Sequence, residues 1–370
     1  MRCIMYVAFV VLMSFAPSVA LTVATQNVVE PLSQVPTGPN SSYSSPTILK
    51  TSGEKMCLLG AAVPEFYMLG TQKAGSTTLA MDMFRLGFKS AIDPLKELHT
   101  FDSHCNYRKD SERTKREYMP YGASMDVCKK MTDSEKEAWT HPFSRCESKP
   151  VTALTDFTPA NLRLPGLPGL MADLYGEKKS QLTFGIMVRE PVSRFQSGWY
   201  YAGGPTAYNT TFREHVDSVL SMAENMDDEG IGQEYFLDQF YRSLYSTNMK
   251  HWFDEFKPEQ FIIIPSGLYL KNETFKASLM QDIGRKMSME VNTSRLEAKP
   301  LRHPLEGSHP PLIEDLDSSQ IATLRAKHYD PAINELSQML AEAIPDGLTL
   351  SGFEGRPIPS DIEAFLRSSW

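Results

Sequence analysis

The chain has no excess of positive charge, few cysteines and no internal repeat. Of its 370 residues, 37 are basic and 45 are acidic, which gives a formal net charge of −8. Such a balance provides no general attraction for nucleic acid or for an anionic membrane surface, so a polyanionic partner would need a local basic patch. Neither a repeat of fixed length nor a coiled-coil heptad pattern is present, which argues against a repeat array or a long rod.

The five cysteines include no tight Cys-x-x-Cys pair and none is paired with histidine, which argues against a zinc site. Apart from Cys3, the chain contains Cys57, Cys105, Cys128 and Cys146, an even number that allows two disulfides in three connectivities. Three of these four fall between residues 105 and 146, where we expect a disulfide-stapled, irregular insertion. The alternative is that they are ordinary buried thiols.

The N-terminus has the pattern of a targeting segment. Arg2 precedes an apolar run to Phe15, and Ser18-Val19-Ala20 suits signal peptidase, so residues 1–24 are predicted to be a signal peptide or an uncleaved signal anchor. Residues 25–55 are rich in proline, serine and threonine and are expected to be a stem or linker.

Glycosylation sequons agree with entry into the secretory pathway, although each is weak alone. They begin at Asn40, Asn209, Asn272 and Asn292. Together with the leader and the cysteines, they predict a glycoprotein of the secretory pathway, either anchored as a type II membrane protein or cleaved and secreted. The membrane would be contacted only through the N-terminal anchor.

A glycine loop follows a short apolar segment near residue 66. Gly70 and Gly75 keep the spacing of a nucleotide-triphosphate loop, but Ser76 occupies the position of the usual lysine and Lys73 lies inside the loop. The pattern predicts a strand over 65–69, a turn over 70–75 and a helix over 76–86.

Such a loop can bind an anion. Backbone N–H groups at a helix start attract negative charge, and the hydroxyls of Ser76, Thr77 and Thr78 add donors. Lys73 would lie beside a bridging oxygen of the bound group, where it can neutralise a leaving phosphate. The plain alternative is that the two glycines only close a tight turn.

A second anion site is predicted at Arg189. Residues 182–188 form a continuous apolar strand, Arg189 follows its carboxyl end, and Ser197 projects from the helix that begins near Pro191. Ligands of open α/β sheets bind at this end of the strands, and arginine binds phosphate well. Alone, Arg189 would more often form a surface ion pair. With the first loop, it suggests a nucleotide that carries phosphate at two ends.

These residues resemble those of sulfotransferases. Lys73-Ala74-Gly75-Ser76-Thr77-Thr78 is similar to their 5′-phosphosulfate loop, and Arg189 with Ser197 resembles their 3′-phosphate motif. The resemblance runs from about residue 64 to about residue 340 and is closest to the Golgi carbohydrate sulfotransferases that act on glycosaminoglycans, including the heparan 3-O and chondroitin 6-O types. It implies 3′-phosphoadenosine 5′-phosphosulfate as the sulfuryl donor and the Golgi lumen as the location. No metal is expected, because Lys73 and the backbone dipoles can neutralise the charge of the donor.

The segment Lys96-Glu-Leu-His-Thr-Phe-Asp102 supports this subgroup. It resembles a family motif in which the glutamate is the catalytic base, which implies Glu97 as the base, with His99 and Asp102 supporting it. In-line sulfuryl transfer needs positioning, charge neutralisation and one proton acceptor, so a carboxylate near Lys73 suits the chemistry. The alternatives are an exposed acid at a helix start for Glu97 and a structural role for His99.

Several positions depart from the family pattern. Phe157 stands where heparan enzymes have an acceptor-side lysine, Ser243 replaces a glycine, and Leu268 replaces a usual glutamate. Lys299 aligns with the lysine of a 3′-phosphate loop whose arginine would be Arg302, displaced by one position.

The acceptor is therefore open. The dense basic run over 108–130 is interleaved with acids, so a solvated mixed-charge helix is an alternative to a polysaccharide surface. A glycosaminoglycan, a neutral glycan, a glycoprotein and a small hydroxylated metabolite all remain possible acceptors.

We expect one α/β domain of P-loop-like architecture over residues 56–350, with a central parallel sheet flanked by helices, and a C-terminal tail over 351–370. Residues 205–257 should be helical, with Phe236, Phe240, Leu244 and Trp252 in the core, and residues 312–344 should form two helices separated near residue 330. The expected activity is sulfuryl transfer from the phosphosulfate donor to a carbohydrate hydroxyl. The alternatives are a P-loop kinase and a non-catalytic glycan-binding relative.

Overall fold

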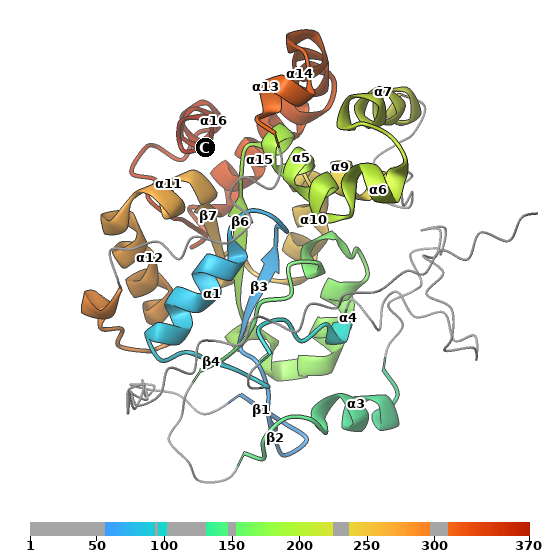
Figure 1. The fold of residues 1–370 in the computed structure, drawn as a ribbon. Coiled ribbons are helices and arrows are strands. Elements are labelled where there is room, and N and C mark those ends of the chain that lie inside the picture. The colour runs from blue at the N-terminus through green and yellow to red at the C-terminus, as the bar shows by residue number, and fades with distance from the viewer. Residues whose placement is uncertain (1–55, 93–94, 102–130, 147–152, 225–236, 297–309) are drawn as a thin grey trace, which may run out of the picture. The chain divides into compact units, whose positions relative to one another are not determined.

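The computed structural model describes residues 56–92, 95–101, 131–146, 153–224, 237–296 and 310–370 (Figure 1). Backbone contacts divide the chain into two units, Met1–Ser44 and Ser45–Trp370, and every described residue belongs to the second. Several predicted features lie outside the described residues: the leader over 1–24, the linker over 25–55, Asp102, Cys105, Cys128, the basic run over 108–130, Phe236, Lys299 and Arg302.

A six-stranded parallel sheet forms the centre of the fold, which confirms the predicted α/β class. Its strands are β3 (Phe66–Gly70), β4 (Lys89–Ser90), β5 (Leu154–Asp156), β6 (Thr183–Val188), β7 (Phe261–Pro265) and β8 (Thr349–Leu350). They are ordered β4-β5-β3-β6-β7-β8, and all five neighbouring pairs are parallel.

The three central strands are buried along their whole length, as expected of a parallel sheet that is covered on both faces. Their side chains alternate between the faces: Phe66 and Met68 belong to one hydrophobic cluster, whereas Tyr67 and Leu69 belong to another. Apolar runs therefore located β3 and β6 to within one residue of the predicted bounds.

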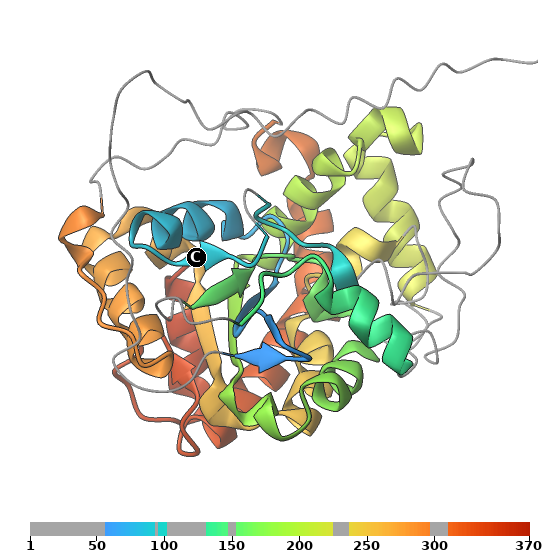
Figure 2. The same ribbon diagram turned by 90° about the horizontal axis from the view of Figure 1, so that it is seen from below.

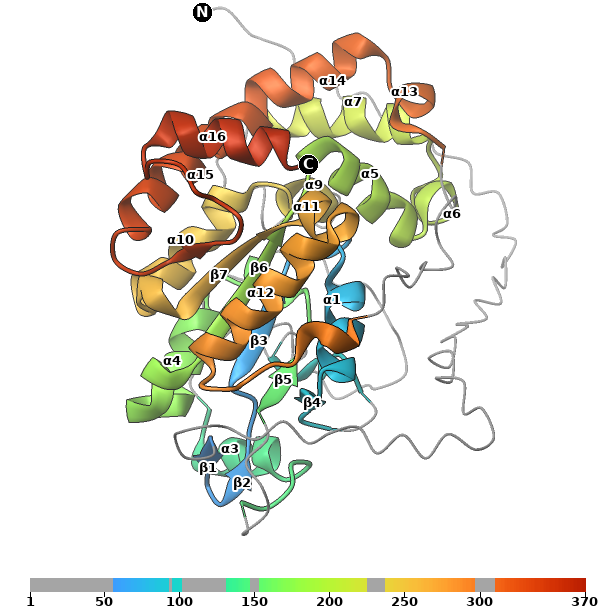
Figure 3. The same cartoon turned by 90° about the vertical axis from the view of Figure 1, so that its left-hand side faces the viewer.

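Helices cover both faces of the sheet (Figures 2 and 3). On the face of Phe66 lie α1 (Ser76–Arg85) and α12 (Glu273–Lys286). On the opposite face lie α4 (Leu167–Tyr175), α10 (Tyr245–Glu255), α15 (Asp330–Ala343) and α16 (Pro359–Ser368).

A third cluster joins helices near the carboxyl end of β6, at the top of Figure 1. It contains side chains of α5 (Pro191–Tyr201), α7 (Phe212–Ala223), α9 (Asp238–Tyr241) and α14 (Ser318–Leu324). Phe240, Leu244 and Trp252 are buried, as predicted.

The shorter elements complete the described chain. They are β1 (Cys57–Leu58), β2 (Ala61–Ala62), α3 (Asp133–Thr140), α6 (Gly204–Tyr208), α11 (Ser266–Lys271), α13 (Leu312–Asp315), the 3₁₀ turns η2 (Asn161–Arg163), η3 (Gly176–Gln181), η5 (Pro258–Gln260) and η6 (Thr293–Arg295), and the π-helical turn η7 (Arg325–Tyr329). Residues 312–344 thus hold more than the two predicted helices, because η7 joins α14 directly to α15 and α13 precedes both.

The packed fold continues beyond residue 350, where the sequence suggested only a tail. Ile362 and Leu366 of α16 are buried in the same cluster as α15. Near the C-terminus, the carbonyl oxygen of Ser369 accepts a hydrogen bond from the Leu268 amide at 3.2 Å.

One disulfide joins Cys57 to Cys146, with their Cα atoms 6.1 Å apart. It ties β1 to the segment after α3, where the Ala62 amide also donates to the Ser144 carbonyl at 2.8 Å. This bond is one of the pairings that the cysteine count allowed.

Two sequon asparagines have local structural roles. The Asn272 side chain accepts from the Phe275 amide at 3.0 Å and caps α12, and Asn292 accepts from the Ser294 amide at 3.1 Å. These contacts give both asparagines a role in the local fold that does not require a glycan.

Candidate active site

The candidate site lies at the carboxyl edge of the sheet, where the strand order reverses. From β3 the chain passes to β4, returns through β5 beside β3, and then crosses to β6 on the other side of β3. In open α/β sheets such a switch point leaves a crevice for ligands outside the carboxyl ends of the strands. The predicted glycine loop follows β3 at this point.

The loop between β3 and α1 depends on a glycine at its end. Gly75 is the N-cap of α1 with φ at 108°, a left-handed conformation that other residues rarely adopt. A Cβ atom there would also lie 3.3 Å from the terminal methyl group of Met187. Since Gly75 offers no capping side chain, the first amides of α1 receive no side-chain cap and are suited to an anion.

Three cations surround the loop. The Arg189 Nη1 donates to the Lys73 carbonyl at 2.9 Å, and the Arg194 Nη1 donates to the Gln72 carbonyl at 3.3 Å. Burial, then the charge of Arg189, then that of Arg194, holds the pKa of the Lys73 ammonium below its usual range. The region around the loop is therefore electropositive, and a bound anion would relieve repulsion among the three cations.

Arg194 was missed by the sequence analysis. Its side chain is fully buried, and its guanidinium binds the Ser243 hydroxyl at 2.6 Å and both the side chain and the carbonyl of Gln239. Burial lowers the pKa of Arg194 to about 10. The sequence did contain one indication of its role. Arg194 lies next to Phe195 on the apolar face of α5, where a charged side chain is unfavourable unless it has specific partners.

Lys73 does not extend into solvent. Its Nζ lies 4.8 Å above the centre of the Tyr201 ring, at the end of α5. Tyr201 itself is 59% exposed, unusually high for a large side chain. The ring therefore provides a resting position for the ammonium through a cation–π contact.

The predicted base, Glu97, is held by two neighbours. The Lys96 ammonium contacts Glu97 Oε1, and His99 Nε2 lies 3.1 Å from Glu97 Oε2. Burial opposes ionisation of Glu97, but the His99 hydrogen bond and the Lys96 charge outweigh it, so that the pKa of this carboxyl lies below its usual range. Lys96, to which the sequence analysis gave no role, also donates to Thr77 Oγ1 at 3.1 Å. It thereby connects the base to the start of α1.

The end of β5 positions this base loop. Asp156 Oδ1 accepts from the Leu98 amide at 3.2 Å and from the Thr158 hydroxyl at 2.7 Å, and Thr158 Oγ1 accepts from the His99 amide at 3.1 Å. Phe157, which stands in place of an acceptor-side lysine, is fully buried in the core.

The other described residues predicted to bind the sulfuryl donor lie in the first turn of α1, on α5 and in the loop before α1. Ser76 is buried and Thr77 and Thr78 are partly buried in the first turn of α1. Ser197 is buried on α5, and within the described residues its hydroxyl makes no hydrogen bond to Arg189. Ala74 is buried, and its carbonyl accepts a hydrogen bond from the Ser266 hydroxyl.

A separate shallow depression, lined by residues of α4, η3 and α10 such as Gly169, Asp173 and Glu255, includes none of the predicted site residues. Three of its lining residues, Asp173, Lys179 and Glu255, are charged, but they lie on elements that precede the amino ends of β6 and β7, whereas the glycine loop follows the carboxyl end of β3.

Comparison with solved structures supports the fold. The chain is similar to a sulfotransferase from Alicyclobacillus acidocaldarius, with a TM-score of 0.50 and 19% identity over 75% of this chain and 96% of that one. A weaker likeness, with a TM-score of 0.35 and 12% identity, covers 65% of this chain and 79% of a sulfotransferase domain from the curacin biosynthetic pathway. No protein-family model and no curated protein sequence matches the chain.

The location expected from the sequence needs correction. The expected location, an anchored protein of the Golgi lumen, is contradicted by the similarity to a bacterial sulfotransferase, which covers 96% of that chain, while the leader over residues 1–24 lies outside the described residues. Within the described part of the chain, the helices are all too short or too polar to serve as membrane spans.

Proposed function

We propose that this chain transfers a sulfuryl group from 3′-phosphoadenosine 5′-phosphosulfate to a hydroxyl group of a carbohydrate acceptor. The observation that carries the proposal is the convergence of Lys73, Arg189 and Arg194 on the loop between β3 and α1, with Glu97 held nearby through Lys96. The fold similarity to a sulfotransferase supports the same reaction class.

The residues present fit such a donor. The uncapped amides of α1, with Ser76, Thr77 and Thr78, would bind the 5′-phosphate beside Lys73. Arg189 donates one nitrogen to the Lys73 carbonyl and makes no second side-chain hydrogen bond to the described residues, so it can still bind a phosphate. Ser197, Lys299 and Arg302 are proposed to complete the 3′-phosphate site, on the strength of the motif resemblance.

When bound, the donor supplies the sulfuryl group and a phosphate leaving group. The acceptor oxygen would form a bond to sulfur as the bond from sulfur to the phosphate oxygen breaks, and Glu97 would take the hydroxyl proton. Lys73 would leave the Tyr201 ring and neutralise the charge that develops on the phosphate. His99 and Lys96 orient the Glu97 carboxylate, one on each oxygen.

The positive charge that P-loop kinases obtain from a metal ion would here come from Lys73 and the backbone dipoles of α1. A kinase would place a metal-binding carboxylate at the end of a strand. The carboxylate that ends β5, Asp156, is buried, and its Oδ1 accepts hydrogen bonds from the Leu98 amide and from the amide and hydroxyl of Thr158, whereas β6 ends next to Arg189. The arrangement therefore favours sulfuryl transfer over the kinase alternative.

The donor assignment is tested by calorimetric titration with adenosine 3′,5′-bisphosphate, the nucleotide product. We expect binding that is weakened at least tenfold when the 3′-phosphate is removed, and weakened similarly by Arg189→Ala. The surface variant Arg285→Ala is the control, since Arg285 is largely exposed and forms an ion pair with Asp282 in its own helix. Tight binding of magnesium ATP without binding of the bisphosphate would refute the assignment.

A further inference from the structure

Every backbone carbonyl of the loop between β3 and α1, residues 71–75 and here called the donor loop, has a hydrogen-bond partner within the protein. Thr71 accepts from the Ala74 amide at 3.1 Å, and Gly75 accepts from the Leu79 amide of α1 at 3.2 Å. The three carbonyls between them accept from side chains on three other elements. Arg194 of α5 donates to Gln72, Arg189 at the end of β6 donates to Lys73, and Ser266 of α11 donates to Ala74.

Several amides of the donor loop, by contrast, are open. Within the described part of the chain, the amides of Gln72, Lys73 and Gly75 make no hydrogen bond, and the first turn of α1 has no side-chain cap. The positive φ values of Lys73, 68°, and Gly75, 108°, are typical of turns in which successive amides form an anion-binding concavity. A loop whose carbonyls are occupied and whose amides are open presents donors to an anion.

Peptide planarity connects each held carbonyl to the amide of the next residue. In a trans peptide unit the C=O and the N–H point in opposite directions. The Gln72 carbonyl shares its peptide unit with the Lys73 amide, and the Ala74 carbonyl shares its unit with the Gly75 amide. The hydrogen bonds from α5 and α11 therefore fix the direction of two amides that the described residues leave open.

Arg194 acts on the donor loop from inside the protein. Its side chain is fully buried and makes four hydrogen bonds, all to protein oxygens. Besides the Gln72 carbonyl at 3.3 Å, these are the Ser243 hydroxyl at 2.6 Å and the side chain and carbonyl of Gln239. A guanidinium has five N–H donors, so nearly all of this one are committed to the protein. Arg194 thus affects a ligand through the loop backbone rather than by direct contact.

The surroundings of Arg194 hold it in this orientation. Gly198 lies one turn further along α5, and a Cβ atom there would overlap Gln239 Oε1, so the glycine allows Gln239 to approach Arg194. The Gln239 amide nitrogen lies 3.1 Å from Asp238 Oδ2, and Asp238 forms an ion pair with Arg242 at 2.9 Å. The arginine is therefore positioned by a packed polar network.

Ser266 holds its carbonyl from a different side. The residue is 1% exposed, begins α11 directly after β7, and donates its hydroxyl hydrogen to the Ala74 carbonyl. Tyr269 of the same short helix donates to Asp82 of α1 at 2.6 Å. The helix α11 therefore binds both the donor loop and the helix that follows it.

We propose that Arg194 and Ser266 are positioning residues for the donor loop, which keep the Lys73 and Gly75 amides directed at the 5′-phosphate of the donor. A loop that is ordered before the ligand arrives lowers the entropic cost of binding. This assignment rests on the proposed function for the identity of the ligand, whereas the positioning of the loop can also be measured with a simple anion.

The test compares adenosine 3′,5′-bisphosphate with adenosine 3′-phosphate, which lacks the group that the donor loop would bind. By calorimetry, Ser266→Ala should weaken binding of the bisphosphate about 3- to 10-fold, as expected for loss of one hydrogen bond, and should leave the affinity for the 3′-phosphate unchanged. Ser337→Ala is the matched control. Ser337 is also 1% exposed and donates to a backbone carbonyl, that of Ile333 at 2.8 Å, but it lies on α15. Both affinities should be unchanged in this control.

Arg194→Lys separates positioning from charge. Lysine keeps the positive charge, but its single nitrogen cannot reproduce the fork of contacts to Gln72, Ser243 and Gln239. Arg194→Lys should therefore lose the preference for the bisphosphate at least tenfold, as Arg194→Gln does. Gly198→Ala, which displaces Gln239 and leaves the charge in place, should reduce the same preference. If the Arg194 variants do not fold, Ser266→Ala alone decides.

Three results would overturn the proposal: an unchanged preference for the bisphosphate in Ser266→Ala, equal weakening of both nucleotides, or a native preference in Arg194→Lys. If the native chain does not bind the bisphosphate, the proposed function fails, and pyrophosphate then decides the positioning role. A pyrophosphate-induced rise in melting temperature that is smaller in Ser266→Ala than in Ser337→Ala would support it. No rise, or an equal rise in both variants, would refute it.

Discussion

Glu97 is the residue on which the proposed chemistry depends most. Replacing it with glutamine keeps the size and most hydrogen bonds but removes the proton acceptor. Glu97→Gln should lower kcat about 10²- to 10⁴-fold without changing the affinity for adenosine 3′,5′-bisphosphate. The exposed Glu259→Gln is the matched control, and equal activity in both variants would rule out Glu97 as the base.

If Glu97 is the base, its carboxyl should set the acid limit of activity. Its pKa is lowered in the folded protein, so Glu97 stays ionised at and above its ordinary value of 4.5 and loses its charge only at a lower pH. The profile of kcat/KM should therefore be flat from pH 7 down to about 5 and should fall below the usual glutamate range of about 4.3. A midpoint between pH 6 and 7 would assign the titration to another group.

His215 makes the fold sensitive to acid. It is buried on α7, and the centre of its ring lies 5.8 Å from the centre of the Phe195 ring and 5.8 Å from that of Trp199. Burial lowers its pKa from 6.5 to about 4. The unfolded chain therefore binds a proton between these values that the folded chain does not, and stability falls as the pH drops through this window.

Between pH 7 and pH 5 this residue should cost about 2 kcal/mol of unfolding free energy, measurable by urea titration at each pH. His215→Leu should show a correspondingly smaller difference between the two pH values. The exposed His141→Leu should retain the full difference, and an unchanged difference in His215→Leu would contradict the assignment.

At the residue scale, sequence patterns predicted the candidate site residues that belong to a recognisable motif. They did not predict the buried arginines near the site that belong to no motif. Lys73, Glu97 and Arg189 were predicted, and the structure places them around one loop and its neighbouring base segment. Arg194 was not, because its partner Gln239 lies 45 positions away in the sequence. Arg242 was not, although its partner Asp238 precedes it by four positions, the spacing of a helical ion pair. The contact of Lys73 with Tyr201 likewise joins residues 128 positions apart.

At the scale of elements, buried apolar runs located the long strands. Strands β4 and β8 have two residues each, which is too few to produce an alternating or continuous apolar pattern. The π-helical turn η7 was also beyond local reasoning, because Tyr329 is fixed by packing against Phe240, with ring centres 5.4 Å apart.

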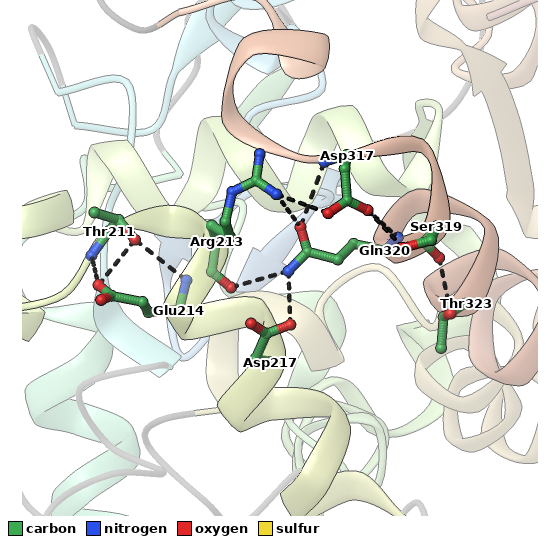
Figure 4. Close-up of polar contacts among 8 residues, drawn as sticks. All are labelled: Thr211, Arg213, Glu214, Asp217, Asp317, Ser319, Gln320 and Thr323. Carbon is green, nitrogen blue, oxygen red and sulfur yellow. Dashed lines mark hydrogen bonds and ion pairs between the residues drawn. The ribbon is translucent and has the colours of Figure 1, made fainter.

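Figure 4 shows how two helices distant in sequence are coupled through Gln320. Its amide nitrogen donates to Asp217 at 2.6 Å and its oxygen accepts from Arg213 at 3.2 Å. Gln320 also completes a capping box with Asp317 at the start of α14. The residue therefore serves both the helix start and the contact between α7 and α14.

Gln320→Ala should lower the unfolding free energy by about 1–2 kcal/mol, since it removes one capping contact and three hydrogen bonds between helices. Urea denaturation at pH 7 measures the change. Ser319→Ala, which removes only an exposed hydrogen bond to Asp317, should cost less than about 0.5 kcal/mol. Equal losses in the two variants would show that Gln320 does not couple the helices.

At the scale of the whole molecule, the parallel sheet with helices on both faces was predictable from strand, loop and helix order. The end of the fold was missed although α16 has helix signals of its own, with Pro359 and Asp361 in its first turn, Arg367 in its last turn, and Ile362 and Leu366 spaced by four on its buried face. The disulfide partner of Cys57 was equally undetermined, since four cysteines permit three connectivities.

The Cys57–Cys146 bond closes a loop of 89 residues. In the chain-entropy account, a loop of this length stabilises the folded state by up to about 4.6 kcal/mol. The double variant Cys57→Ser/Cys146→Ser should therefore unfold at lower urea concentration, and a reducing agent should destabilise the native chain but not this variant. A transition that is unchanged in both cases would mean that the bond contributes nothing to stability in solution.

The most direct test of the account is transfer of ³⁵S from labelled 3′-phosphoadenosine 5′-phosphosulfate by the purified protein to a panel of acidic and neutral glycans. The account predicts a labelled glycan product. Its formation should be lost in both Glu97→Gln and Lys73→Ala and should be unchanged in the surface control Arg285→Gln. Donor binding without a labelled product on any acceptor, or a product that survives Glu97→Gln, would contradict it.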